Sequence, residues 1–128
     1  MAARLIYLAA GTLLAGCAAQ QVADVPPPAS AGAARGASIS CLTQHRIDGQ
    51  RIVDKRTILF RVGRQWYRND LPYECPSLKD DAILVTRSIN GESCSGDIVG
   101  LVDRSSGFSL GSCSYGRFTP VDLPRNVR

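Results

Sequence analysis

The residue types in this chain with the clearest chemical potential are its cysteines and its histidine. There are five cysteines and a single histidine, His45. The cysteines stand at Cys17, Cys41, Cys75, Cys94 and Cys113. Structural zinc sites use four ligands, usually with closely spaced Cys-x-x-Cys pairs. The chain has no such pair, and His45 has no partner at ligand spacing, so we expect no metal and no other cofactor.

The four cysteines after Cys17 form an even set, which in a small exported domain is typical of two disulfides. Four cysteines allow three connectivities, and the sequence does not choose between them. As a working pairing we take Cys75 with Cys94, which would tie a loop to the end of the following hairpin, and Cys41 with Cys113, which would join the two ends of the domain. Each bridge would contribute about 2–4 kcal/mol to stability.

Arginine and tryptophan side chains gather in one segment, TILFRVGRQWYRND at 57–70. Gly63 and Arg64 separate two alternating runs there, which predicts a hairpin with a type II′ turn. One face of this hairpin is apolar and is predicted to face the core; it carries Ile58, Phe60, Val62 and Tyr67. The other face carries the candidate binding residues Leu59, Arg61, Trp66 and Arg68.

An exposed Trp66 flanked by guanidinium groups could bind a partner by stacking and cation–π contact. Trp and Arg are also enriched at the energetic centres of interfaces. The competing interpretation is that Trp66 simply covers core, as the single Trp of a small β protein often does.

Catalytic chemistry finds little support. A Ser-His-Asp arrangement would have to use His45, and no nucleophile-elbow sequence presents a serine. Asp80 and Asp81 could form a carboxylate pair, but adjacent residues on a strand point to opposite faces. Asp97 is interpreted as a turn residue, and Asn69 as bonding the backbone near a strand end. We therefore expect that the protein is not an enzyme.

The N-terminal segment indicates export. Arg4 precedes an apolar run at 5–14, and the sequence LAGC at 14–17 resembles the bacterial lipobox, whose cysteine is lipidated. The run is too short for a bilayer-spanning helix, which needs roughly 20 residues. We predict a lipoprotein signal peptide at 1–16 and a lipid anchor on Cys17; the alternative is an ordinary cleaved signal. Because Ala18 and not Asp follows, resemblance to Gram-negative lipoproteins favours the outer membrane, facing the periplasm.

Residues 17–38 are rich in Pro, Ala and Gly, and are predicted to be a disordered tether after the lipidated Cys17. Residues 39–128 are predicted to form one all-β domain, a small disulfide-linked β-barrel or two-sheet sandwich. Asp48-Gly49 indicates a second hairpin turn. Further strands are expected at 82–88, 97–103 and 116–121, with 97–103 the most central, and at most a short helix at 76–81.

The order of motifs resembles a family of small proteobacterial lipoproteins of unknown function, DUF6491. The resemblance covers nearly the whole folded part and rests on the cysteines and on short motifs: RTI at 56–58, YRNDLP at 67–72, CP at 75–76, CSGDI at 94–98 and GRF at 116–118. It implies an envelope location and the cysteine framework. It implies no activity and no catalytic residues.

Net charge is +4, and acidic residues are interspersed among the basic ones, so no nucleic-acid surface is indicated. We expect an outer-membrane lipoprotein acting as a non-enzymatic binding or accessory module. Its expected partners are the membrane, through the lipid, and another envelope protein. The first alternative is a periplasmic inhibitor or small-ligand-binding lipoprotein. The second alternative is a hydrolase.

Overall fold

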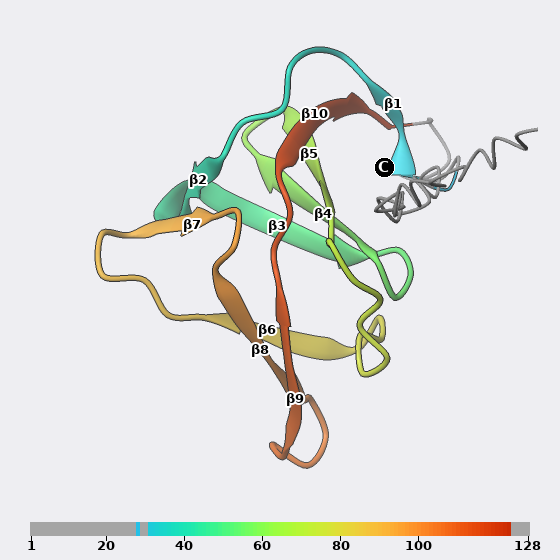
Figure 1. The fold of residues 1–128 in the computed structure, drawn as a ribbon, viewed down its shortest axis with the longest axis vertical. Coiled ribbons are helices and arrows are strands. Elements are labelled where there is room, and N and C mark those ends of the chain that lie inside the picture. Colours follow the sequence, from blue (N-terminus) through green and yellow to red (C-terminus); the bar gives the residue numbers. More distant parts are fainter. Residues whose placement is uncertain (1–27, 29–30, 124–128) are drawn as a thin grey trace, which may run out of the picture.

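The hairpin at 57–70 is the centre of the fold (Figure 1). The computed structural model describes residue 28 and residues 31–123. Strands β4 (Thr57–Val62) and β5 (Gln65–Asp70) pair with Val62 opposite Gln65 and Phe60 opposite Tyr67, as predicted. Gly63 has φ +61°, whereas no described non-glycine residue has positive φ. Only the first turn residue is therefore left-handed, which fits the type II′ turn.

Five strands form the largest sheet, in the order β1-β10-β5-β4-β3. Strand β10 (Phe118–Asp122) pairs with β5, and the short β1 (Ala33–Ala34) pairs with β10. Strand β3 (Ile47–Ile52) pairs with β4 along its whole length. The predicted hairpin turn at Asp48-Gly49 is therefore wrong: the register shifts between Ile47 and Gly49, so these residues form a bulge inside one strand.

The other strands form two smaller antiparallel sheets. Strands β6 (Ala82–Thr86), β8 (Ile98–Asp103) and β9 (Ser109–Ser114) form one, with β8 in its middle. The prediction that 97–103 is the most central strand is wrong for the whole fold, because Thr57–Phe60 of β4 are all buried, whereas β8 alternates between buried and more exposed residues. Strands β2 (Cys41–Thr43) and β7 (Glu92–Cys94) form the other. The predicted all-β class is confirmed, with the strands divided among three sheets.

Helical structure in the described residues is limited to short 3-10 turns, such as η2 (Gln44–Arg46). The helix considered at 76–81 is absent, and turns stand there instead. In the described part of the chain, no helix has the length and apolar character needed to cross a membrane.

Three aromatic rings form the centre of the core. Phe60 of β4 packs against Tyr115 and Phe118 with ring centroids 5.7 Å from each, and both contacts are edge-on. Val99 and Leu101 from β8 reach the same cluster and are fully buried. The core therefore joins the five-stranded sheet to the β6-β8-β9 sheet.

A buried amide fixes the chain where it passes from β9 to β10. Asn69 is 0% exposed, donates its side-chain N–H to the Gly116 carbonyl at 2.8 Å and accepts the Gly116 N–H at 2.9 Å. A Cβ on Gly116 would collide with the backbone carbonyl of Asp70. Asn69 thus bonds the backbone as expected, although the partner lies 47 residues away.

The structure corrects the working disulfide pairing, Cys75–Cys94 and Cys41–Cys113. The bridges are Cys41–Cys94 and Cys75–Cys113. Cys41 and Cys94 are directly opposite each other in the β2-β7 pair, with Cα atoms 4.0 Å apart. Cys75, in the connection before β6, is joined instead to β9.

The folded region begins earlier than predicted. Residues 31–38 were assigned to the tether, but Ala31 is fully buried and Ala34 pairs with Val121 of β10. Gly32 is pressed against the Asp122 carbonyl, since a Cβ there would lie 2.6 Å from that oxygen. The lipidation predicted at Cys17 and the rest of the tether lie outside the described residues.

We predict that peptide mapping without reduction recovers Cys41 linked to Cys94 and Cys75 linked to Cys113. Replacing Cys75 and Cys113 together by Ala should lower the free energy of unfolding by about 2–4 kcal/mol, because the bridge restricts the unfolded chain. The same digest after reduction and alkylation is the control. Recovery of a Cys41–Cys113 peptide would contradict the structure.

Candidate binding groove at Trp66

The structure divides the four candidate binding residues into two buried and two accessible ones. Leu59 is 0% exposed and Arg68 is 8% exposed, so neither offers a binding surface. Trp66 is half-buried, and Arg61 is exposed. The prediction of one exposed face with four binding residues is therefore wrong for Leu59 and Arg68.

Leu59 is buried because residues at the C-terminal end of the described region cover it. A second small apolar cluster forms on this face of the hairpin from Leu59, Val121 and Leu123, with Val53 and Trp66 packed against it. Burying apolar surface contributes roughly 25 cal/mol per Å². Part of the Trp66 ring therefore covers core and part remains accessible, so each interpretation of the sequence describes part of this side chain.

Arg68 serves the structure. Its Nε donates to the Asp70 carboxylate at 2.8 Å, and its NH1 donates to the Gly32 carbonyl at 2.9 Å. A buried guanidinium is tolerated only when it is paired and hydrogen-bonded. Arg68 therefore holds the segment before β1 against β5 and is not available to a ligand.

A groove of about 470 Å³ lies beside Trp66. We call it the Trp66 groove. It brings together residues from the β4-β5 turn, from β10 and from the segment after β1. Its lining is Arg35, Arg61, Gly63, Arg64, Gln65, Trp66, Val121, Asp122 and Leu123.

Three arginines, Arg35, Arg61 and Arg64, line this groove together with Trp66. The Arg61 guanidinium carbon lies 5.9 Å from the Trp66 ring centroid, within the range of a cation–π contact. Arg61 also donates to Asp48 at 2.8 Å, and this bond lowers the pKa of that carboxyl. Arg35 pairs with Asp122 at 3.1 Å, both side chains being largely exposed.

Arg64 is the cation of this groove without a counter-ion. It is exposed at the hairpin turn, and no ion pair joins it to any residue in the described part of the chain. The groove therefore presents a half-buried aromatic ring with excess positive charge beside it. That chemistry suits an anionic group, which Arg can bind through two parallel hydrogen bonds.

Arg35 and Arg64 were missed as site residues by the sequence analysis. The sequence predicts Arg64 only as a turn residue. Its place at the tip of the hairpin that carries Trp66 nevertheless indicates that it lies near Trp66. Arg35 lay in the predicted tether, and the sequence contains no local signal that β1 would pair with β10.

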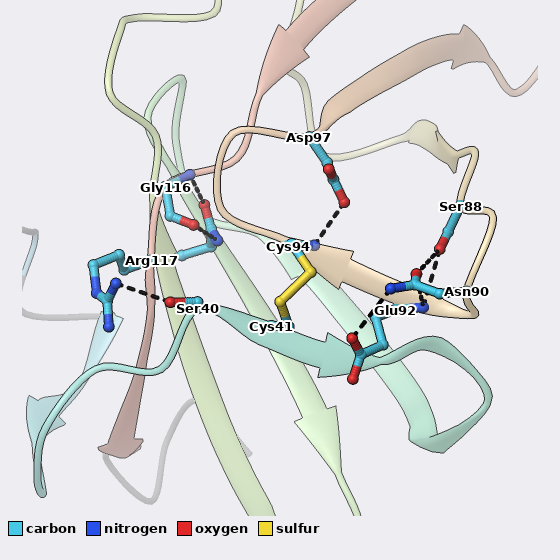
Figure 2. Close-up of a disulfide and its surroundings, with 10 residues drawn as sticks. Ser40, Cys41, Ser88, Asn90, Glu92, Cys94, Asp97, Gly116 and Arg117 are labelled. Atoms are coloured by element: carbon cyan, nitrogen blue, oxygen red, sulfur yellow. Dashed lines mark hydrogen bonds between the residues drawn. A yellow bond between two sulfur atoms is a disulfide. The ribbon is translucent and has the colours of Figure 1, made fainter.

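Figure 2 shows the second cluster of chemistry-bearing residues, around the Cys41–Cys94 disulfide. Glu92 lies close enough to both sulfurs to suggest a three-ligand metal group. The two sulfurs are bonded to each other, however, so neither is a thiolate that could bind a metal. Asp97 accepts the Cys94 N–H at 2.7 Å and is a turn residue, as expected.

The remaining sequence candidates do not assemble a catalytic group. His45 is exposed in η2. Asp80 and Asp81 stand in a turn, where Asp81 faces Lys79 at 3.7 Å. Lys79 also binds Asp103 at 2.8 Å, which contributes most to a pKa of Asp103 well below its usual range.

Comparison of the chain with family models, with curated proteins and with solved structures gives no match in any of the three. The resemblance to DUF6491 lipoproteins therefore stays a prediction.

We predict that Leu59→Ala lowers the free energy of unfolding by about 2–4 kcal/mol, because it leaves a cavity in a fully buried cluster. Arg61→Ala should change it far less, since this side chain is exposed. Urea unfolding followed by the emission of Trp66, the single Trp of the chain, measures both. Equal effects of the two substitutions would contradict the placement of Leu59.

Proposed function

We propose that this protein is a non-enzymatic binding module of the bacterial cell envelope, held by a lipid on Cys17, that binds an acidic partner in the Trp66 groove. The observation that carries the proposal is that three arginines line one groove with a half-buried indole, over which the Arg61 guanidinium lies. One of them, Arg64, has no counter-ion among the described residues.

The chemistry of the groove defines the partner. A carboxylate on the partner would complete the ion pairing of Arg64. An apolar or aromatic neighbour of that carboxylate would lie on the accessible part of the Trp66 ring. We therefore expect a protein segment that places Asp or Glu next to an apolar residue.

Binding fits this groove better than catalysis does. Its lining offers one carboxylate, Asp122, and that group is paired with Arg35. Nucleophilic catalysis needs a nucleophile within reach of a base, and no Ser, Cys or His among the described residues lines the groove. What the groove supplies instead is charge and a flat aromatic surface.

Two observations support the envelope location. The pair of disulfides favours an oxidising compartment outside the cytoplasm. The lipobox-like sequence at 14–17 adds the lipid anchor, and the absence of Asp after Cys17 favours the outer membrane. A stable anchor needs more than one acyl chain, as the lipobox resemblance implies.

We predict that a photo-crosslinker at position 34 captures one discrete envelope protein in cells. Ala34 is exposed and pairs with Val121, which lines the groove. Arg64→Glu should reduce this capture about tenfold or more, since it replaces the unpaired cation by a like charge of the partner. Quantitative mass spectrometry of the crosslinked product measures the loss.

Arg104→Glu is the matched control, because Arg104 is an exposed arginine in the turn after β8 and does not line the groove. It makes the same change of net charge and should leave the capture intact. Equal loss in both variants would indicate a general charge effect. Undiminished capture by Arg64→Glu would exclude the Trp66 groove as the binding site.

We further predict that cells fed an alkyne analogue of palmitate label the wild-type protein and not a Cys17→Ser variant. The reason is that a lipobox cysteine is the acceptor of the acyl chains. Gel fluorescence after coupling to a dye measures the label, and the variant should remain at the size of the unprocessed chain. Labelling of Cys17→Ser would contradict the proposed anchor, and equal processing of both proteins would indicate an ordinary signal peptide.

A further inference from the structure

Two sheets of this protein end in strands with an open edge on the same side of the core. Strand β3 is the last strand of the five-stranded sheet, and β6 is the last strand of the β6-β8-β9 sheet. Ile47 and Gln50 of β3 line the same cleft as Leu84 and Thr86 of β6, so the two edges lie beside each other. An open edge presents backbone N–H and C=O groups that can pair with another extended segment.

Hydrogen bonds on the paired side show which backbone groups of β3 face outward. The Val53 N–H donates to the Thr57 carbonyl at 2.9 Å, so Val53 faces β4. Residues of an antiparallel strand alternate between facing the neighbour and facing away. Arg51 therefore also faces β4, and the backbone groups of Gln50 and Ile52 point to the open edge.

The same alternation applies to the other sheet. The Asp103 N–H donates to the Phe108 carbonyl at 2.8 Å, so Asp103 and Leu101 face β9. Val102 and Gly100 then face β6, where they pair with Ile83 and Val85. The backbone groups of Leu84 and Thr86 consequently point away, to the open edge of β6.

These outward-facing residues line two clefts that meet at Gln50. The smaller cleft, of about 250 Å³, includes Gln50, Leu84 and Thr86 in its lining, and Phe60 contributes to its apolar wall. The larger, of about 590 Å³, runs from Gln50 along the end of β3 and the turn that follows it to Lys55, with residues 78–80 on its other side. We call the two together the β3–β6 groove.

A buried polar atom in the smaller cleft lacks a partner. The side-chain nitrogen of Gln44 is buried and makes no hydrogen bond to any described residue, and Gln44 lines this cleft. An amide N–H left in this state is unfavourable, because burial removes its hydrogen bonds to water and nothing replaces them. A carbonyl oxygen from an occupant of the cleft would satisfy it.

The rest of the smaller cleft is neutral. Among the described residues, its lining contains no charged side chain. One buried polar group of the lining is the Tyr115 hydroxyl, which shares a hydrogen bond of 2.8 Å with Thr86. Burial raises the pKa of Tyr115, so this hydroxyl is uncharged at neutral pH. The occupant at this point must therefore be uncharged, with hydrogen-bonding atoms and an apolar part.

We propose that the β3–β6 groove binds an extended peptide segment of a partner protein, which adds as a strand to the open edge of β3 and places a main-chain carbonyl at Gln44. Only an extended backbone matches the row of outward-facing N–H and C=O groups on β3. Its side chains alternate, so an apolar, uncharged residue enters the smaller cleft while its neighbours point outward.

Hydrogen exchange of the free full-length protein tests the open edge. The amides of Gln50 and Ile52 should exchange rapidly, because they face away from β4, while that of Arg51 should be protected. Protection of Gln50 and Ile52 in a dilute sample would mean that the N-terminal segment of the same chain fills the groove. Protection that appears only at high concentration would mean that a second copy does. Either result would overturn the proposal.

Peptide binding tests the occupant. A library of displayed random heptapeptides is selected against the full-length protein, and an enriched peptide is titrated against two variants at one position. Gln50→Pro removes the outward-facing N–H, while Gln50→Val loses the same side-chain amide and keeps the N–H. The peptide should bind Gln50→Pro at least about tenfold more weakly than Gln50→Val, which is the reference because both variants lack the side-chain amide that lines the groove. Equal affinity for the two variants, or no enriched peptide, would overturn the proposal.

Thermal unfolding checks that the variants fold. A third substitution tests the same proposal without introducing a proline into β3. Gln44→Met removes the unpartnered N–H and should leave the unfolding midpoint unchanged or raised. It should still weaken binding of the selected peptide, because the carbonyl that Gln44 would bind loses its donor. Unchanged affinity in Gln44→Met would exclude the carbonyl contact.

Discussion

The buried amide of Asn69 is the interaction on which the arrangement of the sheets depends. Its two hydrogen bonds to Gly116 hold the chain at the point where it leaves the β6-β8-β9 sheet and enters the five-stranded one. Such reciprocal bonding satisfies both ends of the side chain, so the group can be fully buried. The aromatic contacts among Phe60, Tyr115 and Phe118 form around that junction. An apolar residue at 69 would leave the Gly116 backbone without these partners.

The surface features of this protein arise where the covering of the hairpin is incomplete. On one face, Val121 and Leu123 cover Leu59 and only part of Trp66, which leaves the Trp66 groove beside their edge. On the other face, the smaller sheets cover most of the core and leave the outer edge of β3 unpaired. Both candidate sites are thus edges of the same packing arrangement, and the smaller cleft of the β3–β6 groove reaches the central aromatic cluster at Phe60 and Tyr115.

Local patterns in the sequence predicted local structure well. The 57–70 hairpin, its register and its turn follow from alternation and one glycine, because these depend on neighbouring residues alone. Asp48-Gly49 has equally good turn chemistry, yet pairing with β4 continues past it and makes it a bulge. Tertiary pairing with a long partner strand overrode a two-residue preference there.

Features that depend on distant contacts could not be predicted in this way. The disulfide pairing follows from β2 lying beside β7, which no spacing of the cysteines specifies. The burial of Leu59 and Arg68 depends on residues near both ends of the folded region, including Gly32 and Val121. The sequence therefore predicted two residues of the candidate site, Arg61 and Trp66. Arg35 lies in the site only because β1 pairs with β10.

The position of β1 also sets how the domain would be presented at a membrane. Strand β1 lies at one edge of the five-stranded sheet and β3 at the opposite edge. With an anchor at Cys17, as proposed, the chain up to Ala31 could span at most about 45–50 Å. The Trp66 groove includes Arg35, just after β1, so it lies close to the point where the proposed tether joins the domain. The open edge of β3 lies at the opposite edge of the sheet, so its occupant would approach the domain far from that point.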